Sequence, residues 1–170
     1  MPPANPADRQ LADDLRNALL TLLRELLSGP ADTGAFVLNR GDRGLLASLD
    51  ALSAEMASAQ PGGRSSVAAH VDHLRYGIEL LNRWARSDDP WSTADYGASW
   101  QRQHVSDPQW SALRVALADE ARAWMAACEE RREWDKQGVT EALASVVHLA
   151  YHVGAIRQLA HAASGPAAAD

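Results

Sequence analysis

Two histidines lie four residues apart near the C-terminal end of the chain. His148 and His152 belong to a stretch with helical periodicity that runs from residue 139 to residue 163. A helix turns about 100° per residue, so the two imidazoles leave it about 40° apart and roughly one turn along the axis. Both rings can therefore reach one metal ion, and the spacing identifies His148 and His152 as candidate metal ligands.

A histidine pair at this spacing also occurs at the ordinary boundary between the buried and exposed faces of a helix, so a metal site needs a third ligand. The other histidines are His70, His73, His104 and His161. His161 lies about 180° around its helix from His152, and His104 falls in an expected loop, so we expect both to face solvent. His70 and His73 are the remaining candidates.

The helix that carries these two candidates is indicated by a regular apolar stripe. Ser65 or Ser66 can cap its start, and apolar residues recur with a spacing of four and three at Val67, Val71, Leu74, Ile78, Leu81 and Ala85. His70 lies about 60° from the centre of the stripe and His73 about 120°, so the helical angle favours His70. His70 can also be a histidine at the edge of the core, hydrogen-bonded to a neighbour, or a residue that supports the metal ligands or replaces one of them.

Four long helices and one shorter helix account for most of the chain. Apolar periodicity predicts the long helices over 7–27, 67–85, 107–134 and 139–163, with a break at Gly138, and the shorter one over 45–59. No window alternates in the manner of a strand. We expect an all-α fold, an antiparallel four-helix bundle with an additional short helix, in one domain with its core over about 7–163 and flexible tails.

The segment from residue 91 to residue 106 is expected to be a long loop. It has no sustained period but contains Trp91, Tyr96 and Trp100, and three aromatic side chains favour a loop that packs over another part of the molecule. We interpret Trp100 and Trp110 as packing residues. A pocket that opens onto the imidazoles beside this loop would favour an enzyme, whereas a sealed apolar core would favour a non-catalytic helical module.

Composition limits the classes of function. The chain has 170 residues, of which 46% are hydrophobic and 22% charged, a length and composition that suit one domain with its own core. Its formal charge of −6 disfavours a nucleic-acid partner.

We expect no membrane span, because no window approaches about 18 uninterrupted apolar residues, and no export signal. Cys128 is the single cysteine, which we expect to be a buried, inert thiol in a cytoplasmic protein.

Two stretches of the chain resemble the DinB/YfiT-like family of bacterial metal-binding four-helix bundles. In that family a helix that begins with Trp and Ser or Thr carries a His-Leu or His-Ile step eight residues later, and the final helix carries His-x-x-x-His before a Gly-Gln-Ile sequence. This chain has His73-Leu74 within the segment 65–74 and His148-x-x-x-His152 downstream. Ser65 stands where the family usually has Trp, and Gly154-Ala155-Ile156 replaces Gly-Gln-Ile. The resemblance covers about residues 11–162.

The resemblance implies a function for three of the histidines. His73, His148 and His152 match the ligands of a divalent metal ion, with Zn or Ni the expected metals, and this assignment selects His73 over His70. Relatives of this kind join low-molecular-weight thiols such as bacillithiol or mycothiol to electrophiles, or isomerise maleylpyruvate with mycothiol. The chain is therefore expected to be a metal-dependent thiol S-transferase or a hydrolase-like enzyme acting on a small molecule.

Two alternatives remain open from the residues themselves. Glu79, Glu120, Glu129 or Glu130 can supply a fourth, carboxylate ligand, although solvated helix faces also account for them. The chain can instead be a non-catalytic bundle, a stress-associated binding or dimerisation module. A homodimer is expected in either case, with the leucine-rich first helix as a contact surface.

Overall fold

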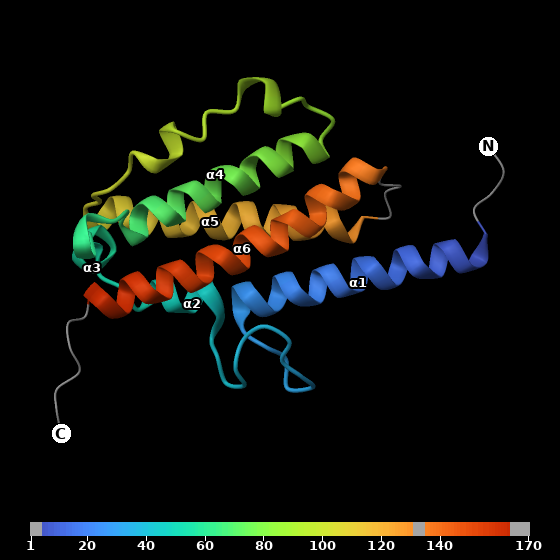
Figure 1. Cartoon of the computed structure of the whole chain (residues 1–170), viewed down its shortest axis with the longest axis horizontal. Helices are drawn as coiled ribbons and strands as arrows, with labels where there is room; N and C mark the ends of the chain where they lie inside the picture. Colours follow the sequence, from blue (N-terminus) through green and yellow to red (C-terminus); the bar gives the residue numbers. More distant parts are fainter. Residues whose placement is uncertain (1–4, 131–134, 164–170) are drawn as a thin grey trace.

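The chain folds into helices over the residues that the computed structural model describes, 5–130 and 135–163 (Figure 1). Six α-helices lie in this part of the chain: α1 (Pro6–Ser28), α2 (Gly44–Asp50), α3 (Ala54–Ser58), α4 (Val67–Ala85), α5 (Asp107–Glu129) and α6 (Lys136–Ala163). Three short 3-10 helices join them, η1 (Pro61–Gly63), η2 (Trp91–Thr93) and η3 (Ala98–Trp100). The expected all-α class is confirmed; the tails expected to be flexible lie outside the described residues.

Polar side chains at the helix starts explain where several helices begin. The side chain of Asn5 accepts a hydrogen bond from the Ala7 N–H at the start of α1, and the hydroxyl of Ser66 accepts from the Ala69 N–H at the start of α4. Such caps satisfy backbone N–H groups that have no partner within the helix. Their positions match the starts expected from the sequence to within one or two residues.

The last helix starts earlier than its sequence indicates. We expected Gly138 to interrupt the chain, but α6 begins at Lys136 and continues through Gly138. The carboxylate of Asp135 accepts a hydrogen bond of 2.8 Å from the Gly138 N–H, so a side-chain cap offsets the low helix propensity of this glycine. The helix expected over 107–134 ends at Glu129, since Glu130 is extended; residues 131–134 lie outside the described part.

The helix expected over 45–59 is two separate helices. α2 ends at Asp50, and α3 starts at Ala54, where the hydroxyl of Ser53 accepts from the Met56 N–H. The break is stabilised from outside the segment, because the indole Nε1 of Trp110 donates to the backbone oxygen of Leu52 at 2.8 Å. A carbonyl left without its helical partner is thus satisfied by a distant side chain.

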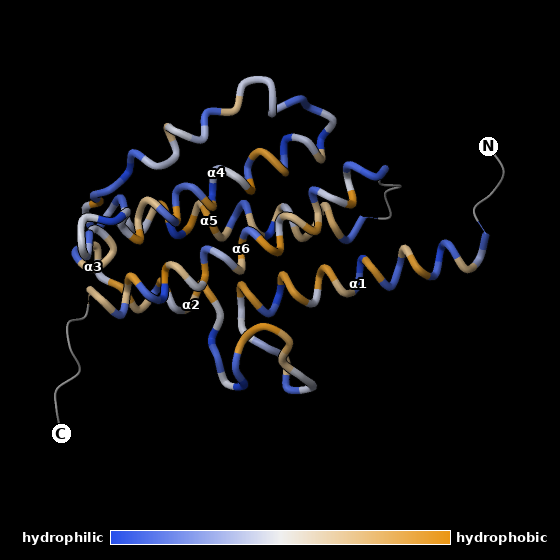
Figure 2. Tube along the Cα trace, in the orientation of Figure 1, coloured by the Kyte–Doolittle hydropathy of each residue, from blue (hydrophilic) through white to orange (hydrophobic). Residues whose placement is uncertain are grey.

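The four long helices share one buried core. α4 contacts α5 and α6, and α1 also contacts α5 and α6. Hydrophobic residues recur along each of these helices (Figure 2), and the most buried include Leu26, Val71, Leu117 and Cys128, each 0% exposed. Burial and the neighbouring Glu129 raise the pKa of the Cys128 thiol to about 12, which agrees with the expected inert cysteine.

The segment after α4 packs along that helix, as its aromatic residues predicted (Figure 1). The hydroxyl of Tyr76 accepts from the Asp95 N–H at 2.9 Å. The largely buried carboxylate of Asp72 forms ion pairs with Arg75 on its own helix and with Arg102 from the segment. These bonds attach the segment to α4 on the side where the histidines lie.

The length and composition of α6 bear on the expectation of no membrane span. Among the described residues, α6 is long and apolar enough to cross a membrane when only length and composition are considered. A core helix of a soluble protein meets the same criterion, and α6 packs on both α1 and α4.

Candidate metal centre

Four histidines from two helices meet where α4 packs on α6. His73 of α4 and His148 and His152 of α6 each offer a ring nitrogen, and these atoms all lie within 4.8 Å of one another. Nε2 of His148 is 3.2 Å from Nε2 of His73 and 3.0 Å from Nε2 of His152. The structure thus brings together the three histidines selected by the family resemblance, from segments 75 residues apart.

His70 joins the same cluster from the opposite side of His152. Its Nδ1 lies 2.9 Å from Nδ1 of His152, whereas the nitrogen of His152 that faces His148 is Nε2. His70 is therefore hydrogen-bonded to a neighbouring residue, as one of the two sequence interpretations held. The helical angle does not separate the two histidines of α4, because both reach the cluster: His70 contacts Nδ1 of His152, and His73 contacts Nε2 of His148.

Ser99 of η3 selects the protonation form of His73. Its hydroxyl carries one hydrogen, which it donates to the backbone oxygen of Tyr96 at 2.7 Å. Toward Nδ1 of His73, 2.9 Å away, the same oxygen must accept, so Nδ1 of His73 carries the proton. In a neutral imidazole the other nitrogen, Nε2, then has a free lone pair.

The other nitrogen–nitrogen contacts of the cluster fit one arrangement of protons in which all four imidazoles are neutral. Because Nε2 of His73 is an acceptor, Nε2 of His148 must be the donor across their contact of 3.2 Å. Nε2 of His152 then also accepts from His148, so the proton of His152 sits on Nδ1 and is donated to Nδ1 of His70. Two of the three converging nitrogens already have free lone pairs, and only His148 has to move its proton to Nδ1 for all three to face a cation.

Burial keeps these imidazoles uncharged at neutral pH. Burial lowers the pKa of His70 and of His148. Burial, together with repulsion from His148 and His70, lowers the pKa of His73 to about 4. Burial, together with repulsion from the other three rings, lowers the pKa of His152 to about 3. Neutral imidazole is the form that binds metal ions.

Two of the three nitrogen separations fit binding to a common transition-metal ion. Zn is bound by imidazole nitrogens at about 2.0–2.1 Å in tetrahedral sites, which places two such ligand atoms about 3.3 Å apart. Two of the three separations, 3.2 Å and 3.0 Å, are close to this value, and the third, between His73 and His152, is at most 4.8 Å. Three neutral nitrogens with a fixed orientation are also a suitable donor set for Ni.

Aromatic side chains of the segment after α4 cover one side of the cluster. The indole of Trp100 stacks on His73 with ring centres 4.3 Å apart and meets His70 edge-on at 5.0 Å. His73 and His152 are buried, whereas His148 is partly exposed. Gly77 lies next to His148, since a Cβ there would be 3.5 Å from Cε1 of that ring. The more open approach to the nitrogens is therefore beside His148.

No protein-family model matches the chain, and neither the curated proteins nor the solved structures contain a significant match to it.

The other histidines and carboxylates considered in the sequence lie apart from this cluster. His104 and His161 are exposed, as expected. Among the described residues, the group of ligand atoms that converges comprises histidines alone. Three of the four candidate carboxylates have partners outside the cluster: Glu79 binds Arg75, Glu129 binds Arg24, and Glu120 accepts from the buried Asn82. Glu120 is thus not the fully solvated residue that its position suggested. The fourth carboxylate, Glu130, is exposed.

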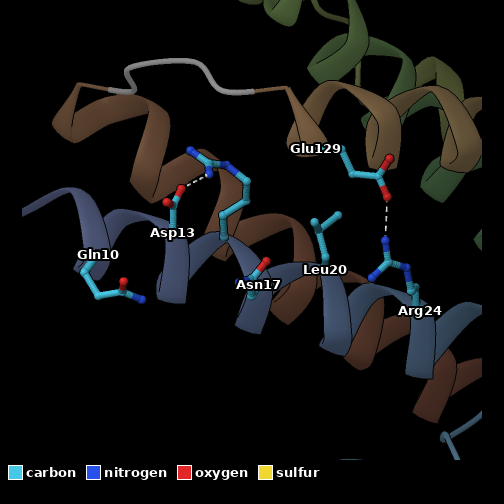
Figure 3. A pocket seen from close by; sticks show the side chains of 7 residues that line it. Gln10, Asp13, Asn17, Leu20, Arg24 and Glu129 are labelled. Carbon is cyan, nitrogen blue, oxygen red and sulfur yellow. Dashed lines mark hydrogen bonds and ion pairs between the residues drawn. The ribbon is translucent and has the colours of Figure 1, made fainter.

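A separate hollow lies away from the histidines, between α1 and the end of α5 (Figure 3). It measures about 500 Å³ and is lined by Gln10, Asp13, Arg16, Asn17, Leu20, Arg24 and Glu129. Its charged side chains form ion pairs, Arg16 with Asp13 and Arg24 with Glu129. Because the atoms that could bind a metal converge at the histidines, we place the candidate site there and not at this hollow.

The sequence analysis did not predict Ser99 as part of the site, and it did not predict which residue His70 contacts. Ser99 gave no signal, since it lies in a segment without periodicity and becomes a neighbour of His73 only through the short helix η3. The contact of His70 with His152 depends on how α4 and α6 cross. Neither relationship follows from spacing along one helix.

Proposed function

We propose that Nε2 of His73, His148 and His152 binds one divalent metal ion, with Zn or Ni the best candidates. The observation that carries the proposal is the convergence of these nitrogens at separations of 3.2 Å and 3.0 Å. Further support comes from the hydrogen bonds of Ser99 and His70, which occupy the opposite nitrogens of two of the rings. Metal-bound histidines commonly donate their second N–H to a hydrogen-bond acceptor, which fixes the orientation of the ring.

The chemistry we propose is that of a metal-dependent enzyme acting on a small molecule, a thiol S-transferase or a hydrolase-like enzyme. A divalent ion held by three protein ligands retains open positions and lowers the pKa of a thiol or water bound there. Trp100 shields the buried rings from water. The cavity that His148 lines measures about 20 Å³, room for about one water molecule, and His73, His152 and Trp100 do not line it. It is not the open pocket beside the loop that would favour an enzyme, so a substrate has to approach from the exposed side of His148.

The architecture we propose is an antiparallel four-helix bundle of α1, α4, α5 and α6, in a cytoplasmic protein of the DinB/YfiT-like kind. The order and spacing of His73-Leu74 and His148-x-x-x-His152 support this relationship, as does the packing of α4 and α1 against both α5 and α6. Bundles of this kind build metal sites from side chains on facing helices.

Metal content tests the proposal. The protein is purified without chelators, and metal per chain is measured by mass spectrometry for the natural protein, His148→Ala and His104→Ala. We expect about one Zn or Ni per chain, a loss in His148→Ala, and no change in His104→Ala, which alters an exposed histidine outside the cluster. Equal metal content in all three proteins would remove the site.

The two proposed reaction types are distinguished with cobalt. Co(II) replaces Zn in many three-histidine sites and shows a sulfur-to-metal charge-transfer absorption when a thiolate binds. If the chain is a thiol transferase, adding a low-molecular-weight thiol produces this absorption, and His148→Ala abolishes it. No absorption at saturating thiol would favour the hydrolase-like alternative.

A second candidate is a non-catalytic module that forms a homodimer, and one observation favours it. Between Gln137 and Ala162, the charged residues of α6 are Glu141 and Arg157, both partly buried, and the more exposed positions carry no Asp, Glu, Lys or Arg, although 22% of the chain is charged. Leu143, Val147 and Tyr151 on this face are 45%, 69% and 68% exposed. A charge-free apolar face is suited to pack on a second copy of itself.

Sedimentation velocity tests the dimer. Val147→Glu is expected to convert a dimer to a monomer, whereas Val115→Glu, on the exposed face of α5, is not. The sequence pointed to the first helix, where Leu11 is 70% exposed, and Leu11→Glu tests that surface. A natural protein that sediments as a monomer at high micromolar concentration would contradict the dimer.

A further inference from the structure

The contact between His70 and His152 is buried and fixed from both sides. His70 is 9% exposed and His152 1% exposed, and their Nδ1 atoms are 2.9 Å apart. His70 stands in the first turn of α4, where its N–H bonds to the backbone oxygen of Ser66, and its ring meets Trp100 edge-on. A buried contact between two ring nitrogens at this distance requires one of them to carry the proton.

The direction of this hydrogen bond has consequences for His152. If His70 were the donor, Nδ1 of His152 would be the acceptor and the proton of neutral His152 would sit on Nε2, where it would block the nitrogen that faces His148. If His70 is the acceptor, Nε2 of His152 keeps its lone pair. Only the second direction agrees with the donor role of His148 toward His73, which follows from Ser99.

We propose that His70 is a positioning residue: its Nδ1 accepts the hydrogen bond from Nδ1–H of His152 and thereby holds Nε2 of His152 free of a proton and directed at the metal site. The inference rests on the proposed function in that it assigns His70 a role toward the metal, but the hydrogen bond itself joins two protein side chains and does not involve a metal. His70 acts through His152 and is not a ligand.

The role of His70 predicts different behaviour for two substitutions. His70→Asn retains an acceptor, because the amide oxygen of Asn stands two bonds from Cβ, as Nδ1 of His does. His70→Leu fills the space without an acceptor. Losing a hydrogen-bonding partner of a metal ligand typically lowers metal affinity about 10–100-fold. We expect a loss of this size for His70→Leu and an affinity within about threefold of the natural protein for His70→Asn.

The first experiment measures Zn affinity by competition with a chromophoric chelator for the natural protein, His70→Asn and His70→Leu. Thermal unfolding of the metal-free proteins is recorded alongside. A tenfold or greater loss in His70→Leu that His70→Asn restores supports the positioning role. Equal affinities in all three proteins would overturn it, as would equal losses in both variants. If the natural protein binds neither Zn nor Ni, the proposed function fails, and the second experiment still tests the hydrogen bond.

The second experiment uses the metal-free protein labelled with ¹⁵N at histidine. Long-range proton–nitrogen spectra show which ring nitrogen of His152 carries the proton, a readout that a simple packing role would not move. We expect the proton on Nδ1 in the natural protein and in His70→Asn, and a shift to the Nε2 form in His70→Leu. A proton on Nε2 of His152 in the natural protein at neutral pH would overturn the inference.

Discussion

The hydroxyl of Ser99 lies 2.9 Å from Nδ1 of His73 and joins the segment after α4 to the histidine cluster. Because that hydroxyl donates to the backbone oxygen of Tyr96, its acceptor side faces His73. The segment therefore contributes to the protonation form of a candidate ligand, in addition to covering it with Trp100.

Removal of this hydroxyl should weaken metal binding. In Ser99→Ala, Nδ1–H of His73 loses its acceptor inside a buried site, so the Nε2-protonated form of His73 becomes accessible. We expect about a tenfold loss of Zn affinity, measured by chelator competition. The control is Ser92→Ala, an exposed serine of the same segment. Unchanged affinity in Ser99→Ala would show that His73 does not depend on this hydrogen bond.

The metal-free protein should lose stability as pH falls from about 6.5 toward 4. Burial, with repulsion from neighbouring rings, lowers the pKa of His73 to about 4 and of His152 to about 3, below the ordinary value of about 6.5 for an unfolded chain. Between these values the unfolded chain binds more protons, so acid favours unfolding, and this contribution to stability is fully present only above about pH 6.5.

Urea unfolding in the presence of EDTA between pH 7.5 and pH 4 measures this dependence. His152→Gln should show a shallower decline than the natural protein, because it lacks one of the buried groups that must stay neutral. His104→Ala, which changes an exposed histidine, serves as the control. A decline as steep in His152→Gln as in the natural protein would assign the acid sensitivity to other groups.

Metal should stabilise the folded protein, because the ligands converge only when α4 and α6 are packed together. Binding at a free metal concentration of about 100 times Kd adds about 2.7 kcal/mol to the free energy of unfolding. Thermal unfolding with and without Zn should therefore shift upward in the natural protein and remain constant in His148→Ala. An equal upward shift in both proteins would place the stabilising ion elsewhere.

Glu25 should contribute to stability independently of the metal site. Its buried carboxylate accepts hydrogen bonds from the N–H groups of Phe36, Val37 and Leu38; burial acts to raise its pKa, but these bonds outweigh burial and lower it. Glu25→Ala removes the acceptor of all three bonds and is expected to cost about 2 kcal/mol.

Urea unfolding at pH 7 measures this cost. Glu129→Ala, which removes an exposed ion pair with Arg24, should change the free energy of unfolding by less than about 1 kcal/mol. If the two substitutions cost the same, the hydrogen bonds of Glu25 do not hold the loop after α1 in place.

The sequence predicted the long helices well because their signals are local. In α4 the apolar stripe and the cap at Ser66 both lie within the helix, and the structure places them as expected. The break between α2 and α3 depends instead on Trp110, which donates to Leu52 from 58 residues away. No residue near position 52 indicates that hydrogen bond, so the apolar periodicity predicted a single helix in place of α2 and α3.

The spacing of residues along single helices predicted only part of the candidate site. His148 and His152 followed from spacing on one helix, but helical angle preferred His70 over His73, and the family resemblance supplied the choice of His73. The structure explains this difficulty: both rings enter the cluster and contact different nitrogens of α6. The pairing is determined by how the two helices cross, which a single helix does not encode.

The location and identity of a bound metal test the central claim most directly. Crystals of the protein loaded with Zn or Ni are measured on both sides of the absorption edge of that element. We predict one anomalous peak about 2.0–2.1 Å from Nε2 of each of His73, His148 and His152. An anomalous peak elsewhere, or three unliganded imidazoles in a crystal with saturating metal, would contradict it.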